Sequence, residues 1–320
     1  MSQPYVREDV KMVLSMLEQQ EGPQMHESSP AEARQMMRAM GQLTERPRGD
    51  LHEVKDIKIA SGHGHEIPAR VYHAAAPAGP APVLLYYHGG GWVIGDLETH
   101  DPLCAEIARQ LGMTVVSIDY RLAPEHKFPA AGEDCVAATK WAAGSPSELG
   151  HDVTGLIVSG DSAGGNMAAI VAQELTGKLD APIIAQFLIY PGVDMTADSG
   201  SMQEFGEGYL LTAEGMAWFS QHYLGGPEDV EDHRASPIKA DSLAGQPPAL
   251  VFTCGLDPLR DQGRAYAGRL IEHGVRTIYR EAAGQIHGSF NMRQAIPSAQ
   301  ADLTGCIADL KHLISETEAG

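Results

Sequence analysis

The stretch GLIVSGDSAGGNMAAIVAQEL, residues 155–175, contains the most specific motif of this chain. An apolar run precedes the pentapeptide GDSAG (160–164), and a segment with the pattern of a helix follows it. A serine in G-x-S-x-G between a strand and a helix lies on a sharp turn that exposes its hydroxyl above a sheet. The pentapeptide alone could be a glycine-rich corner, but with these flanks it predicts a nucleophile, Ser162.

Short apolar runs alternate with helical patterns along most of the chain. The runs lie at 82–87, 114–120, 155–160, 185–191, 249–255 and 275–281, and helical patterns at 101–111, 132–143, 164–176 and 261–273. Continuous apolar strands that alternate with helices indicate an α/β fold, with a mainly parallel sheet covered on both faces. Two earlier runs, 54–60 and 67–73, flank SGHGHE and predict a hairpin.

Two segments interrupt this alternation and predict a helical cap over the sheet. The first, residues 1–50, is helical and polar, and Ser29 with Glu32 forms a capping-box pattern at the start of its second helix. The second, residues 191–235, has no strand pattern, and Thr212 can cap a helix there. The catalytic domain is therefore expected in two parts, 51–190 and 236–320.

Composition excludes several classes of function. The chain of 320 residues has 23 basic and 42 acidic residues and a formal net charge of −19, which argues against nucleic acid and anionic membrane surfaces as partners. Its four cysteines are widely spaced, so free, largely buried thiols are expected. The first residues lack the pattern of a signal peptide, and no apolar stretch is long enough to span a membrane, so a cytoplasmic location is predicted.

A serine hydroxyl needs a base, which follows the serine and an acidic residue in the architecture that carries this motif. His287, in EAAGQIHGSF, is predicted on a glycine-bracketed loop just beyond an apolar strand, at the carboxyl edge of the sheet. The remaining histidines after Ser162 lie in or beside the 191–235 insertion, or in or at the ends of predicted helices: His222, His233, His273 and His312. His287 is therefore the predicted base.

The acid that orients the base should follow an earlier strand. Asp257 lies two residues beyond Gly255, at the end of the run ALVFTCG, where it can fix the imidazole tautomer. Asp261 lies one turn further on and is expected to cap or pair with the next helix. Reversed roles for the two aspartates stay open at this point.

The stretch YYHGGGWVIGD (86–96) places three glycines directly after an apolar run. Acyl transfer builds negative charge on a carbonyl oxygen, and glycines allow backbone N–H groups to approach it. We expect Gly89 and Gly90, with the N–H of Ala163, to donate to this oxyanion, and Gly91 to make the turn. His88, which precedes the glycines, is expected to anchor this loop through a hydrogen bond and not to act as the base. A nucleotide site is excluded by spacing, since GGGWVIGD matches neither G-x-G-x-x-G nor the P-loop pattern.

These segments together resemble the hormone-sensitive-lipase-like family of α/β-hydrolases, in its GDSAG subgroup of microbial esterases. The matching text is HGGGW (88–92), YRLAPEHKFPAAGED (120–134), GDSAGGN (160–166), GLDPLRD (255–261) and IHG (286–288). The resemblance implies an α/β-hydrolase fold with a split cap. It implies a catalytic triad of Ser162, Asp257 and His287, with Gly89, Gly90 and Ala163 as the oxyanion hole.

Within the 120–134 segment, Arg121, Glu125 and Asp134 are expected to be structural, holding loops near the site. Two positions depart from the family pattern. Gln262 occupies a place where the family often has Glu, and Ser289 a place where Phe is usual. Either change could alter the pocket wall and the acyl preference.

The sequence thus predicts a carboxylic ester hydrolase for short-chain esters that acts through a covalent acyl-enzyme. No cofactor and no metal is required; the expected partner is a small-molecule ester, and a homodimer is possible. An amidase or an acyltransferase would use the same triad. A non-catalytic small-molecule receptor on this fold would be expected to lack the nucleophile or the base, yet Ser162 and His287 are both present.

Overall fold

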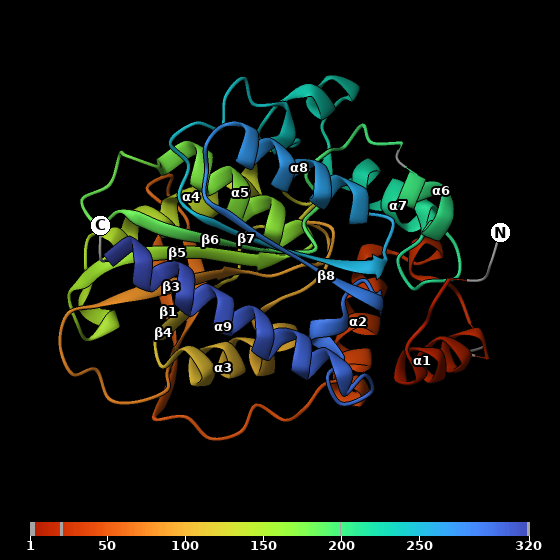
Figure 1. The fold of residues 1–320 in the computed structure, drawn as a ribbon, viewed down its shortest axis with the longest axis horizontal. Coiled ribbons are helices and arrows are strands. Elements are labelled where there is room, and N and C mark those ends of the chain that lie inside the picture. Colours follow the sequence, from red (N-terminus) through yellow and green to blue (C-terminus); the bar gives the residue numbers. More distant parts are fainter. Residues whose placement is uncertain (1–3, 20–21, 199, 319–320) are drawn as a thin grey trace.

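An eight-stranded sheet runs through the centre of the computed structural model, which describes residues 4–19, 22–198 and 200–318 (Figure 1). Its strand order is β1-β2-β4-β3-β5-β6-β7-β8. The pairs β1–β2 and β2–β4 are antiparallel, and the other neighbours are parallel. The strands are β1 (Glu53–Ala60), β2 (Glu66–His73), β3 (Ala81–Tyr87), β4 (Thr114–Ile118), β5 (Val153–Asp161), β6 (Ile183–Ile189), β7 (Ala249–Leu256) and β8 (Thr277–Ile286).

All eight predicted strands, including the hairpin, are confirmed with small shifts at their ends. The helices between them are α3 (Leu97–Leu111), α4 (Ala130–Ala143), α5 (Ala163–Leu175) and α8 (Arg260–Glu272), and α9 (Ser298–Glu318) follows the last strand. Helix α3 begins four residues before the predicted start, because Asp96 caps it by accepting the N–H of Thr99 at 2.8 Å. Strand β8 extends to Ile286, so that His287 follows it directly.

The two faces of the sheet are covered by different helices. Helices α3 and α9 pack on one face, and α4, α5 and α8 on the other (Figure 1). Each face has its own buried apolar cluster, and the neighbouring side chains Tyr86 and Tyr87 enter opposite clusters. All four cysteines are buried and free, as predicted. Within the described residues, no helix combines the length and the apolar character needed to cross a bilayer.

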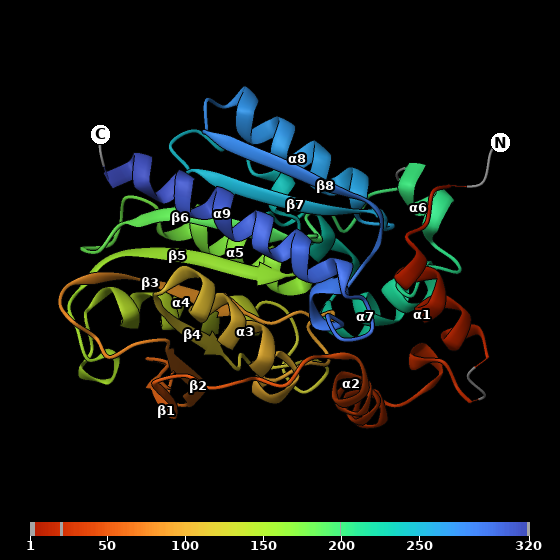
Figure 2. The ribbon, with the colours of Figure 1, turned by 60° about the horizontal axis from the view of Figure 1, so that its bottom comes forward.

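Further helices gather beyond the carboxyl ends of the parallel strands (Figure 2). They come from two distant segments, and capping by Ser29 and by Thr212 is confirmed. The first segment holds α1 (Glu8–Glu18), η1 (Met25–Glu27) and α2 (Pro30–Thr44); the second, between β6 and β7, holds α6 (Gly200–Phe205) and α7 (Ala213–Tyr223). The chain then returns to the sheet through η3 (Pro227–Glu231) and η4 (Pro237–Lys239), and η4 packs on α5. The outer ends of the predicted segments, residues 1 and 320, lie outside the described residues.

One side chain of α5 holds both ends of the second segment. The Nδ2 group of Asn166 donates to the carbonyl oxygens of Gly192 at 2.7 Å and Ala235 at 2.9 Å. Asn166 is fully buried and lies in the first turn after the nucleophile motif. The insertion is therefore attached at its base to the helix that follows Ser162.

The end of α2 is joined to the segment after β8 by a buried ion pair. Arg293 Nη2 lies 3.1 Å from Glu45 Oε1, and the two residues are only 1% and 7% exposed. Burial raises the pKa of the Glu45 carboxyl, although the Arg293 guanidinium lies beside it. The pair thus orients two segments, and either charge alone would be costly to bury.

Arg293→Met should lower the free energy of unfolding by about 3 kcal/mol, because it leaves the Glu45 carboxylate buried without a counter-charge. The double variant with Glu45→Met should recover most of that loss, since it removes the stranded charge. Urea unfolding of both variants measures the difference. A double variant no more stable than Arg293→Met would show that burial of the charge is not the cause.

Candidate active site

Ser162 lies on the turn between β5 and α5 in a strained conformation. Its φ of 57° and ψ of −118° are rare for a residue with a side chain, and such strain concentrates at functional sites. Gly160 and Gly164 make the turn possible, because a Cβ on either would overlap the carbonyl oxygen of Tyr87. The local structure predicted from G-x-S-x-G is thus present.

The structure brings Ser162, His287 and Asp257 together. His287 Nε2 lies 2.8 Å from Ser162 Oγ, and His287 Nδ1 lies 2.7 Å from Asp257 Oδ2. A carboxylate only accepts, so Nδ1 carries the proton and Nε2 is left to accept the hydroxyl proton of Ser162. Asp257 is fully buried, and its other oxygen accepts the N–H of Leu259 at 2.8 Å. The arrangement can activate a hydroxyl as a nucleophile.

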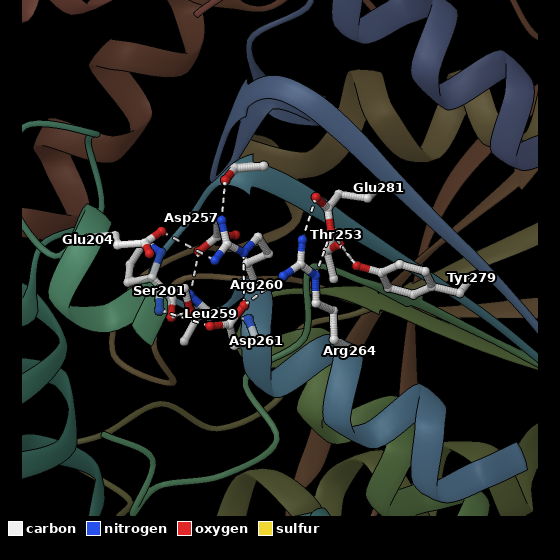
Figure 3. Close-up of polar contacts among 12 residues, drawn as sticks. Ser201, Glu204, Thr253, Asp257, Leu259, Arg260, Asp261, Arg264, Tyr279 and Glu281 are labelled. Atoms are coloured by element: carbon white, nitrogen blue, oxygen red, sulfur yellow. Dashed lines mark hydrogen bonds and ion pairs between the residues drawn. The ribbon is translucent and has the colours of Figure 1, made fainter. Parts of the chain in front are cut away.

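The two candidate aspartates have different partners, and Figure 3 shows those of Asp261. Asp257 contacts the imidazole, whereas Asp261 accepts hydrogen bonds from the backbone of Ser201 and from Arg260 and Arg264. The four other histidines that follow Ser162 in the sequence contact other polar groups. These are the backbone carbonyl of Trp218 for His222, Asp232 and Glu174 for His233, Ser242 for His273 and Glu316 for His312. Of the candidate aspartates and histidines, the structure therefore places Asp257 and His287 beside Ser162.

The N–H groups of the glycine loop, residues 88–95, are not all available to a ligand. Gly89 N–H, a predicted donor, already donates to Asp161 Oδ1 at 2.8 Å. Within the described part of the chain, the N–H groups of Gly90 and Gly91 have no hydrogen-bond partner. Both positions need glycine: Gly90 has a φ of 118°, and a Cβ on Gly91, with a φ of 57°, would overlap the ring of Phe219. The predicted role of Gly89 as an oxyanion donor is therefore wrong, whereas Gly90 remains a candidate donor.

Asp161, which the sequence reasoning did not single out, joins the segments around Ser162. Its carboxylate accepts hydrogen bonds from Gly89 N–H at 2.8 Å, the Tyr86 hydroxyl at 2.7 Å and Asn291 Nδ2 at 3.1 Å. His100 Nε2 lies 3.2 Å away. These donors come from β3, the glycine loop, the turn after His287 and α3. In the sequence, Asp161 could have been noticed only as an acidic residue within the GDSAG turn, directly after an apolar strand.

The charge of Asp161 is stabilised in spite of its burial. Burial alone would raise the pKa of the carboxyl, but His100, the Tyr86 hydroxyl and the Gly89 N–H hold it at about 2. Because the folded-state pKa is depressed, the carboxylate adds stability above about pH 4, and this is lost only as the pH falls toward 2. Asp161 is therefore ionised throughout the neutral range.

His88 anchors the glycine loop, as the sequence predicted. Its Nδ1 lies 2.9 Å from the carbonyl oxygen of Gly89, and its ring stacks on Tyr120 at 4.2 Å between centroids. Burial, reinforced by the neighbouring His100, lowers the pKa of His88 to about 4. A neutral, fully buried imidazole of this kind supports a loop and does not serve as the base for Ser162.

The residues predicted to hold nearby loops do so. Arg121 Nε donates to Asp134 Oδ2 at 2.9 Å, and Glu125 pairs with Arg34 of α2 at 2.7 Å. Arg34 also donates to the carbonyl oxygen of Val93 at 2.8 Å, so α2 contacts the glycine loop directly. The first helical segment is thus attached to the loop that surrounds Ser162.

The two departures from the family pattern have contacts with the scaffold. Gln262 is 4% exposed, and its Oε1 accepts the N–H groups of Val193 and Asp194 at 3.0 Å each. Ser289 is fully buried, with its Oγ 3.7 Å from Cys254 Sγ. Gln262 therefore supports the start of the insertion, and Ser289 supports the turn that carries His287.

Side chains of the insertion lie over the catalytic loops. The ring of Phe219, on α7, is so close to Gly91 that a Cβ there would overlap it. Leu210 lies 3.9 Å from the place that a Cβ on Gly288, the residue after His287, would take. Tyr223 stacks on Trp92 at 4.4 Å between ring centroids. The space above Ser162 is therefore bounded by bulky apolar groups.

Comparisons with known proteins agree with this geometry. Residues 84–291 match a family described as having the alpha/beta hydrolase fold. The carboxylic ester hydrolase LipN of Mycobacterium tuberculosis is 42% identical over 84% of this chain and 73% of its own length. The ethyl acetate hydrolase of Pseudomonas putida is 36% identical over 90% of this chain and 91% of its own length.

Solved structures give the same result. A thermostable esterase from Pseudomonas putida ECU1011 superposes with a TM-score of 0.92 at 33% identity, covering 98% of this chain and 99% of that one. An ester hydrolase from the metagenome of Lake Arreo, in complex with a bipyridine phosphonate derivative, gives a TM-score of 0.90 at 38% identity over 95% and 98% of the two chains. The predicted resemblance and fold are confirmed.

Asp161→Asn should lower kcat for 4-nitrophenyl acetate by about 100-fold with little change in KM. The new side chain would carry an NH2 group, which donates, at a place where Gly89 N–H and the Tyr86 hydroxyl also donate. Gly89 would lose its acceptor, and the glycine loop would no longer be held in position. Asp134→Asn is a matched control, because Asp134 is equally buried and pairs with Arg121 away from Ser162. Steady-state kinetics of both variants, with unfolding curves measured in parallel, test this prediction. An equal loss of kcat in the two variants would contradict it.

Proposed function

The chain belongs to the alpha/beta hydrolase family, and on that premise we propose that it cleaves esters through Ser162, His287 and Asp257. The protein is a carboxylic ester hydrolase, as its relatives are. The observation that carries the assignment of the residues is the continuous chain of short contacts, 2.8 Å from Ser162 to His287 and 2.7 Å from His287 to Asp257.

The proposed reaction has two stages. Ser162 Oγ attacks the ester carbonyl while His287 Nε2 takes the hydroxyl proton, and Asp257 stabilises the imidazolium through Nδ1–H. The tetrahedral intermediate then breaks its bond to the alcohol oxygen, which leaves with the proton from Nε2. Water, deprotonated by His287, attacks the acyl-enzyme, and the carboxylic acid departs as Ser162 regains its proton.

We assign the oxyanion donors to Gly90, Gly91 and Ala163. Gly90 and Gly91 have free N–H groups, and Ala163 is the first residue of α5, where an N–H has no partner within the helix. Gly89, the donor expected from the sequence, is replaced by Gly91 because its N–H is bonded to Asp161. The positive end of the α5 dipole favours the negative charge in the same place.

The helices of residues 1–50 and 191–235 are proposed as the two halves of a cap. Support for the second segment comes from Phe219 and Leu210, which lie against Gly91 and Gly288. Apolar groups this close to the reacting atoms leave little room for a long acyl chain. Short-chain esters are therefore the proposed substrates.

Ser162→Ala should lower kcat/KM for 4-nitrophenyl acetate by at least roughly 10⁴-fold, because the triad acts as a unit. His287→Ala should be comparably impaired. His273→Ala is the control, since His273 lies beside Ser242 at the end of α8, and it should remain near the wild-type rate. A Ser162→Ala variant with a tenth of the activity, or a more impaired His273→Ala, would refute the assignment.

A series of 4-nitrophenyl esters from acetate to palmitate, with 4-nitroacetanilide beside it, tests the substrate class. The crowding by Phe219 and Leu210 predicts that kcat/KM is highest for short chains and falls steeply for long ones. Phe219→Ala should move this fall toward longer chains, since it removes a ring from the site. Equal rates across the series would contradict the short-chain proposal, and faster cleavage of the anilide would identify an amidase.

A cytoplasmic location and a homodimer stay predictions from the sequence. The acidic composition, with a net charge of −19, supports a partner that is a small ester and not a nucleic acid.

A further inference from the structure

The acid loop, residues 257–261, has a partner in the insertion that the proposed mechanism does not use. Ser201, in the first turn of α6, is fully buried and exchanges hydrogen bonds with this loop (Figure 3). Its hydroxyl donates to the carbonyl oxygen of Pro258 at 2.9 Å and accepts the N–H of Asp261 at 3.1 Å. Its own N–H donates to Asp261 Oδ2 at 2.9 Å. Three contacts thus join α6 to the loop.

Two arginines extend this junction. Arg260 donates to Asp261 Oδ1 at 2.8 Å and to the carbonyl oxygen of Gly255 at 3.2 Å, and its guanidinium lies 5.1 Å from the ring centroid of Phe205 on α6. Arg264 Nη1 donates to the same Asp261 oxygen at 3.1 Å, and its Nε donates to Glu281 of β8 at 2.7 Å. The junction therefore reaches both the strand before the acid and the strand before the base.

The geometry places Ser201 one peptide away from the acid itself. Pro258 directly follows Asp257, and the next N–H, that of Leu259, fixes Asp257 Oδ1 at 2.8 Å. The peptide group between Pro258 and Leu259 thus helps to set the orientation of the carboxylate toward His287. The Ser201 hydroxyl holds the carbonyl oxygen of this same peptide group from outside the loop.

We infer that Ser201 is a positioning residue for Asp257, so that the insertion between β6 and β7 fixes the acid of the triad as well as bounding the substrate space. This rests on the proposed catalytic role of Asp257. Ser201 touches no reacting atom and acts through the 258–261 backbone. Loss of its hydroxyl lets the carboxylate turn away from His287 Nδ1, which weakens proton transfer while ester binding is kept.

A double-mutant cycle tests this inference. Ser201→Ala should lower kcat for 4-nitrophenyl acetate roughly tenfold with KM within about twofold, since small displacements of a catalytic group are costly. In an Asp257→Asn background the same substitution should cause no further loss, because the group that it positions is already disabled. Equal factors in both backgrounds would overturn the inference. A wild-type rate for Asp257→Asn itself would instead refute the proposed triad.

Ser236 provides the matched control and Asp261 a second variant. Ser236 is also a fully buried serine between β6 and β7, and its hydroxyl donates to Val230 O at 2.7 Å and accepts Met195 N–H at 2.9 Å. Ser236→Ala should lower Tm about as much as Ser201→Ala but leave kcat within about twofold. Equal loss of kcat in both serine variants would overturn the inference. If Ser201→Ala does not fold, Asp261→Asn should show the same non-additivity with Asp257→Asn.

Discussion

The buried carboxylate of Asp161 is the interaction on which the arrangement of the site depends. It directly precedes Ser162, accepts Gly89 N–H and accepts Asn291 Nδ2 from the turn that follows His287. One charged group therefore connects the turn of Ser162, the glycine loop and the turn that follows His287. Because the group is fully enclosed, each donor that satisfies it is held in place by the cost of leaving a buried charge without partners.

The same constraint explains which glycines are free. An N–H that donates to a carboxylate is unavailable to a developing oxyanion, so the proposed oxyanion donors begin at Gly90, one residue after Gly89. Gly90 and Gly91 then adopt positive φ angles of 118° and 57°, and Phe219 of α7 packs directly on Gly91. The insertion thus contributes to both sides of the site, at the glycine loop through Phe219 and at the acid loop through Ser201.

Much of this structure could be predicted from local sequence, because the relevant physics is local. Apolar runs and cap patterns such as that at Ser29 follow from periodicity and from backbone groups a few residues apart. Ser162, Asp257 and His287 could be chosen because each follows a strand, so the sheet brings them to one edge. The donor at Gly89 could not be judged, since its partner Asp161 lies 72 residues away. An effect of Gln262 on the pocket wall is the expectation from sequence, yet its side chain accepts the N–H of Val193, a contact that forms only once the insertion is folded.

The affinity of a trifluoromethyl ketone inhibitor measures how well the oxyanion donors are positioned, because its adduct with Ser162 carries an oxyanion like that of the transition state. If Asp161 holds the glycine loop in its donor position, Asp161→Asn should raise the inhibition constant about 100-fold while KM for the ester stays within about threefold. An inhibition constant equal to that of the wild type would show that the oxyanion donors are positioned without Asp161.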